Sequence, residues 1–166
     1  MKNTMTTFAK AIVPLAAKIN DAATSEREQK VLKQTIGDIL KKAGDLHPSG
    51  CSQAAFDAYL ATGAAGDIRD RTWHQQHSFD PGRHIFIREH CETVRSLRNM
   101  CISDGPFDGI LCILIEKIRI VWVLKEEDRL LTQNGHRTHR QDWRDAYKNA
   151  GITVIPPESG WSGCTD

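Results

Sequence analysis

The amino-acid sequence predicts an α+β fold: a helical N-terminal third of about three helices, followed by a small mixed or antiparallel sheet of three to four strands with interleaved helices. Two observations favour this class. Apolar residues recur at helical spacing over positions 1–62, and β-branched residues become dense only over positions 109–124. Helical and strand patterns then alternate as far as Pro156, as in chains that pack helices against a small sheet.

The first two helices have the clearest signals. An apolar residue every three or four positions over 8–19 predicts an amphipathic helix, which we expect to kink or to start near Pro14. Ser25 and Glu28 then form an S-x-x-E capping box ahead of a single apolar stripe. This arrangement predicts a helix over 26–43.

The later elements are expected from shorter patterns. Apolar residues on both faces of 110–115 predict a buried strand. In 118–124, large apolar residues at every second position predict a second strand beside it. In chain order we expect a loop over 47–50, a helix over 52–61, a strand near 85–87, a helix over 89–102, strands over 110–115 and 118–124 joined by a turn at 116–117, helices over 125–134 and 142–150, and a strand over 152–155.

The chain of 166 residues has the length of one domain. We expect a helical region over 1–62, an α+β core over 63–157 and a loose C-terminal tail over 158–166, packed as one compact domain. The 22 Lys and Arg residues nearly balance 21 Asp and Glu residues, for a net charge of +1. This balance disfavours a protein that coats nucleic acid indiscriminately, and it leaves room for a small, localised anion site.

The cysteines and the apolar runs bear on location. Five cysteines form no C-x-x-C pair and are odd in number, which is typical of free thiols in a reducing compartment. The longest late apolar run, over 109–115, is far shorter than the ~20 residues of a membrane helix. The sequence therefore predicts a cytoplasmic protein with no membrane partner.

Six of the seven histidines fall in two polar tracts that also carry arginine and tryptophan. The first tract spans Asp67 to His90, and the second tract spans Gly135 to Arg144. Both lie in or beside predicted loops, where binding and catalytic residues concentrate. These two tracts are the strongest functional signal in the sequence.

The residue types in the tracts are those that metal-independent phosphodiester cleavage requires. Imidazoles titrate near neutral pH, arginine forks bind phosphate, and tryptophan rings stack on bases. We therefore expect a protein that acts on or binds RNA, DNA or a nucleotide, with cleavage as in ribonucleases as the candidate reaction. The candidate acid–base residues are His74, His77, His136 and His139. The candidate phosphate-binding residues are Arg83, Arg137 and Arg140, and the candidate base-stacking residues are Trp73 and Trp143.

Three alternatives remain open. The H-x-x-H spacing in each tract could supply imidazoles to a zinc ion, but no carboxylate or cysteine stands at a familiar ligand spacing, so no cofactor and no metal ligand are assigned. The second tract could bind an anion without catalysis, near the start of the predicted helix over 142–150. The chain could instead be a non-catalytic regulator or inhibitor that docks a protein partner on an apolar helix face. The sequence contains no P-loop, dinucleotide-binding turn or G-x-S-x-G motif.

Overall fold

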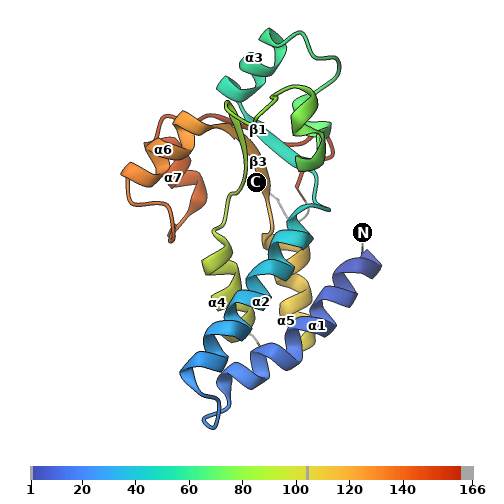
Figure 1. The fold of residues 1–166 in the computed structure, drawn as a ribbon, viewed down its shortest axis with the longest axis vertical. Coiled ribbons are helices and arrows are strands. Elements are labelled where there is room, and N and C mark those ends of the chain that lie inside the picture. Colours follow the sequence, from blue (N-terminus) through green and yellow to red (C-terminus); the bar gives the residue numbers. More distant parts are fainter. Residues whose placement is uncertain (1, 104, 162–166) are drawn as a thin grey trace.

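The computed structural model describes residues 2–103 and 105–161, and it confirms the α+β class (Figure 1). The helices are α1 (Lys2–Asn20), α2 (Glu26–Gly44), α3 (Gln53–Ala61), α4 (Val94–Ser103), α5 (Phe107–Cys112), α6 (Lys125–Gln133) and α7 (Trp143–Asn149), with short helical turns η1 (Ile68–Asp70), η2 (Trp73–Ser78) and η3 (Ile113–Lys117). The strands are β1 (Ser49–Ser52), β2 (Phe86–His90), β3 (Ile120–Leu124) and β4 (Val154–Ile155). They form a mixed sheet in the order β2-β3-β1-β4, in which β1 and β3 run parallel and the other neighbours run antiparallel.

A helical part lies below the sheet in Figure 1 and is made of α1, α2, α4 and α5. Although α4 and α5 come from the middle of the chain, they pack beside the two N-terminal helices. Their shared core includes Ile12, Ile36, Leu97 and Leu114, all fully buried. Burying one side chain of this size contributes about 1.5–3 kcal/mol relative to leaving it exposed. Among the described residues, no helix combines the length and the apolar character that a bilayer crossing needs.

The two N-terminal helices form where apolar spacing predicts them. α1 begins at Lys2 and runs through Pro14, so the expectation that it starts near Pro14 is wrong. α2 begins at the predicted capping box, in which the Ser25 hydroxyl accepts from the Glu28 N–H and the Glu28 carboxylate accepts from the Ser25 N–H. Each of these two hydrogen bonds satisfies an N–H group that has no partner within the helix, so the capping box fixes where α2 starts.

The strand expected over 110–115 and the turn expected at 116–117 are both wrong. These residues are helical, as α5 and the π-helical turn η3, and of the second expected strand only Ile120–Leu124 forms. A short run that is apolar on every side is typical of buried strands and of buried helices alike. Here Ile110, Ile113 and Leu114 fill the core between the helices, so tertiary packing decides the outcome.

Two further boundaries differ from the expectation. The predicted loop over 47–50 contains the start of β1, a strand of small residues that is buried along its whole length. A Cβ at Gly50 would lie 2.6 Å from the Ile155 carbonyl oxygen, so glycine permits the close pairing with β4. The helix expected over 89–102 begins only at Val94, because the residues before it pair with β3 as β2.

The two faces of the sheet carry separate cores, because successive residues of β3 point to opposite sides. Trp122 packs with Tyr59 and Phe79, on the face that α3 and η2 cover. Val121 packs with Tyr147, on the face that α6 and α7 cover. The sheet is therefore buried on both faces, and what remains open is its edge.

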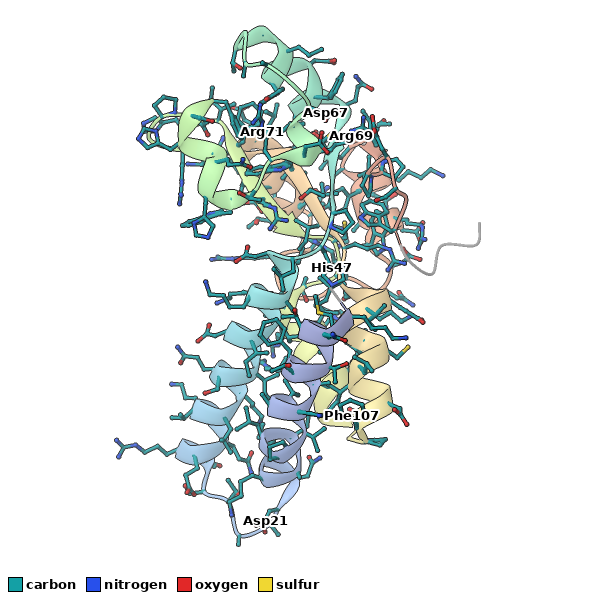
Figure 2. All side chains as sticks on the ribbon, turned by 90° about the vertical axis from the view of Figure 1, so that its right-hand side faces the viewer. Asp21, His47, Asp67, Arg69, Arg71 and Phe107 are labelled. Carbon is teal, nitrogen blue, oxygen red and sulfur yellow. The ribbon has the colours of Figure 1, made fainter. Side chains whose placement is uncertain are left out.

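The end of α2 joins the helical part to the sheet. The Arg88 guanidinium on β2 donates to the main-chain oxygens of Gly44 and His47, and it lies 3.2 Å from the Asp45 carboxylate. His47, labelled in Figure 2 where the two parts meet, places its Nε2 atom 2.8 Å from the Leu114 oxygen. These buried contacts hold the helical part against β2 and so define the space between them.

Candidate anion-binding groove

β2 is an edge strand of the sheet, and the first tract ends within it. The main chains of Ile85 and Cys91 bond toward β3 at 2.8 and 2.9 Å. Because alternate residues of an antiparallel strand bond to opposite sides, the main-chain groups of Phe86, Arg88 and His90 face away from β3. An exposed edge of this kind is normally covered or blocked.

Asp80 and Gln76 of the first tract block one end of this edge. The buried Asp80 carboxylate accepts the N–H of Phe86 at 3.0 Å and the N–H of His84 at 2.9 Å, and the Gln76 amide donates to the Phe86 oxygen at 2.8 Å. Burial acts to raise the pKa of Asp80, but the hydrogen bonds from Phe86, Gln76 and His84 outweigh it and hold that pKa below its usual range.

Arg140 of the second tract blocks the other end. Its fully buried side chain donates to the oxygens of His90 at 2.8 Å, Cys91 at 2.7 Å and His136 at 3.0 Å, and it forms an ion pair with Glu89. These contacts fasten the second tract to the end of β2. The Arg140 guanidinium is therefore occupied by protein acceptors, and phosphate binding by Arg140 is not part of the function proposed below.

Two ionisable side chains of β2 are shifted by burial. Burial raises the pKa of Glu89 to about 7, with Asp128 adding to the shift and Arg140 opposing it. Burial lowers the pKa of His90 to about 4, and the charge of Arg88 adds to that shift. Near neutral pH the His90 ring is therefore uncharged and contributes no cation to the site.

Two adjoining hollows lie along the open edge of β2 and share Arg88, His90 and Val94. The larger hollow, of about 500 Å³, is bordered by Trp73 of the first tract and by the end of α2. The smaller hollow, of about 300 Å³, is bordered by Arg137 of the second tract and by the start of α4. We call the two together the β2 groove. The fold thus brings one residue of each tract to the same groove.

The acidic side chains of the β2 groove, Asp128 apart, already have cationic partners. Asp38 lies 3.1 Å from Lys41, Asp45 lies 3.2 Å from Arg88, and Glu89 pairs with Arg140. Among the cations that line the groove, Lys42, Arg95 and Arg137 make no hydrogen bond or ion pair with any other described residue. Positive charge is therefore available to a ligand along both hollows.

α4 adds a second cation next to Arg95. Burial and the neighbouring charge of Arg95 lower the pKa of Arg98. The Nε atom of Arg98 is buried and has no hydrogen-bond partner among the described residues. Arg98 lines a further hollow of about 720 Å³ between α2 and α4, which meets the β2 groove at Val94 and Lys41. Two like charges held side by side favour an anion between them.

Trp73 and Arg83 form an exposed stack at the rim of the β2 groove. The Arg83 guanidinium carbon lies 3.5 Å from the centre of the Trp73 ring, whose residue is 42 % exposed, and the His74 ring meets Trp73 edge-on at 5.2 Å. Arg83 has a φ of 54°, unusual for a residue with a side chain. The turn from Asp80 to Arg83 places Arg83 over Trp73.

The other predicted site residues are dispersed. His77 is exposed on η2, and His139 lines a separate hollow beside Arg95. The His136 main-chain oxygen accepts from Arg140, and no hydrogen bond joins the His136 ring to another described residue. Trp143 packs against Tyr147 and Trp161 at 5.9 and 5.6 Å between ring centres, so it belongs to the core under α7. Among the described residues, no hydrogen bond or ring contact joins two of the four candidate acid–base histidines.

The sequence did not predict Lys42 or Arg95 as site residues, and it did not predict the open main-chain edge of β2. Lys42 and Arg95 look like ordinary solvated helix cations in sequence, and only the packing of α2 against α4 places them on the groove. The run of three polar residues, Arg88, Glu89 and His90, at the end of an expected strand was a signal in the sequence for a polar sheet edge.

Neither a metal-binding cluster nor similarity to a known protein identifies a function for the described residues. Within residues 2–103 and 105–161, no three His, Cys, Asp or Glu side chains are arranged to hold a metal ion. The hydrogen bonds of Arg69 and Arg71, labelled in Figure 2, also go to protein groups, with Asp67 and Tyr59 as partners. Comparisons with protein-family models, with curated proteins and with solved structures find no match to this chain.

Proposed function

We propose that the protein binds a short single strand of nucleic acid, or a nucleotide, in the β2 groove. The observation that supports this most is the pairing pattern of charges. Apart from Asp128, the acidic groups of the groove are held by Lys41, Arg88 and Arg140, whereas Lys42, Arg95 and Arg137 have no partner among the described residues. A phosphate can pair with these cations without breaking an existing ion pair.

The stack at the rim suits the bases of such a strand. The Arg83 guanidinium lies over the Trp73 ring, and both an arginine plane and an indole ring can stack on any base. The two tracts would then contact one ligand from both sides, with Trp73 on the first tract and Arg137 on the second. The β2 groove would position the phosphates between them.

Binding, rather than cleavage, is the function we propose. Shared acid–base work needs two groups within hydrogen-bond reach of one ligand. His74 stands beside Trp73, whereas His139 borders a different hollow next to α4. Cleavage through His74, His77, His136 and His139 stays a prediction from the sequence, as does a cytoplasmic location.

Fluorescence anisotropy with a labelled single-stranded RNA of about eight nucleotides tests the proposal. The double variant Arg95→Ala/Arg137→Ala removes two groove cations. The matched control Arg27→Ala/Arg129→Ala removes two exposed arginines that line none of these hollows.

We expect the groove variant to weaken binding about tenfold or more, since a charge-assisted bond is worth about 1.5–3 kcal/mol, and the control to change it little. Trp73→Ala should lose a further stacking contact of about 1–3 kcal/mol. Equal weakening by both double variants would show that binding depends on net charge alone and would contradict binding in the β2 groove.

A further inference from the structure

We infer that the open edge of β2 binds the Watson–Crick edge of an unpaired uracil or thymine. The β2 groove would then prefer single strands that contain this base. The inference rests on the proposed function, because the cations of the β2 groove hold the phosphates that accompany the base. It adds what the groove recognises beyond charge.

Three main-chain groups on the outer side of β2 carry the inference. The N–H and C=O of Arg88 and the N–H of His90 face away from β3 and make no hydrogen bond to any other described residue. The groups on either side of them are occupied, at Phe86 by Asp80 and at the His90 oxygen by Arg140. Along the strand the free groups therefore stand in the order donor, acceptor, donor.

The main chain at Arg88 carries exposed surface. The Arg88 side chain is only 5 % exposed, yet the residue as a whole is not fully buried, so its main chain supplies much of its exposed surface. The Arg88 guanidinium is held away from the edge, on Ser49 and the end of α2. Arg88 and His90 line both hollows of the β2 groove, so a planar ligand can reach them from either side.

The length of the open edge favours a base over a peptide strand. An added β-strand pairs over several residues, usually three to ten. Here the contacts of Asp80 and Gln76 at Phe86, and of Arg140 at His90, leave a single residue and one further N–H between them. That window spans two residues, about 7 Å of strand, which is room for one planar group but not for a paired peptide strand.

The order of donors and acceptors selects the base. The Watson–Crick edge of uracil or thymine presents acceptor, donor, acceptor, which complements the order on β2 at all three positions. Cytosine places an acceptor at its centre, opposite the Arg88 oxygen, and the purines match at most two of the three groups. An unmatched polar group in a confined site loses its hydrogen bond to water without gaining another, so it weakens binding.

Four single-stranded oligonucleotides of about eight residues and equal charge test this inference by fluorescence anisotropy: oligouridine, oligocytidine, oligo-N3-methyluridine and an abasic strand. The methyl group removes the central donor and keeps the phosphates and the ring. We expect oligouridine to bind about tenfold tighter than each of the other three. In ¹⁵N-labelled protein, the amides of Arg88 and His90 should shift with oligouridine and not with the methylated strand.

The outcomes separate this inference from the proposed function. Equal affinity for all four strands, lost in Arg95→Ala/Arg137→Ala, would overturn base recognition and leave phosphate binding standing. Absence of binding to any strand would overturn both. Shifts of the Arg88 and His90 amides with an uncharged extended peptide, and not with oligouridine, would show that β2 pairs with a strand instead and would also overturn base recognition.

Discussion

Arg140 and Arg137 lie three positions apart in one tract, and the structure assigns them opposite roles. Arg140→Ala removes the donor from three main-chain oxygens and leaves the Glu89 carboxyl without its cation. Breaking a buried pair by deleting one partner costs about 3–5 kcal/mol. Arg137 is exposed and bonds to no other described residue, so Arg137→Ala should change the free energy of unfolding by less than about 0.5 kcal/mol.

Chemical denaturation at pH 7, followed by circular dichroism, measures both values. For a chain of this length about 1 kcal/mol shifts Tm by roughly 2–4 °C, so Arg140→Ala should melt about 10 °C lower and Arg137→Ala within about 2 °C of the parent. A loss below about 1 kcal/mol in Arg140→Ala would contradict the reasoning, because Arg140 would then not be fastening the second tract to β2. Equal losses in the two variants would contradict it as well.

Three further predictions concern the same edge. Asp80→Asn should lower the free energy of unfolding by about 3 kcal/mol at pH 7, since an amide cannot accept all the N–H groups that the carboxylate accepts. Because the folded pKa of Asp80 is depressed, the parent protein should lose this contribution as pH falls below ~4. Chemical denaturation of both proteins across that pH range measures the loss. Burial raises the folded pKa of Glu89 to about 7, so its contribution to stability is present below its unfolded pKa and is lost as pH rises through 7. Between pH ~5 and ~8 the free energy of unfolding should therefore fall in the parent protein and change less in Glu89→Gln. Parallel pH profiles for the two proteins would contradict this prediction. Gly44→Ala would put a Cβ 2.6 Å from His90 Nε2 and should cost about 1–3 kcal/mol in the same denaturation assay, although alanine favours helices.

The sequence could predict those parts of the fold that local chemistry determines. Ser25 and Glu28 fix the start of α2 through hydrogen bonds three residues apart, so the boundary was predictable from two side chains. The run from Ile110 to Ile115 was not predictable, because its residues are apolar on every side and only the neighbouring helices make it helical. Tertiary contacts decide such segments, and one sequence does not contain them in readable form.

The candidate site shows the same division. The two tracts were visible as clusters of His, Arg and Trp, and Trp73 and Arg137 do border the β2 groove. Within a tract, however, the sequence could not distinguish Arg140, which is buried against main-chain oxygens, from Arg137, which is exposed. That distinction depends on where the edge of β2 lies, since a strand edge attracts the polar groups that block it.

The salt dependence of oligonucleotide binding tests the central claim most directly. For single strands the logarithm of the affinity falls with the logarithm of salt concentration by about 0.7 for each phosphate that is neutralised. If Arg95 and Arg137 contact phosphates in the β2 groove, Arg95→Ala/Arg137→Ala should reduce that slope by about 1.4, and Arg27→Ala/Arg129→Ala should leave it unchanged. An unchanged slope in the groove variant, or the same reduction in both variants, would contradict phosphate binding in the β2 groove.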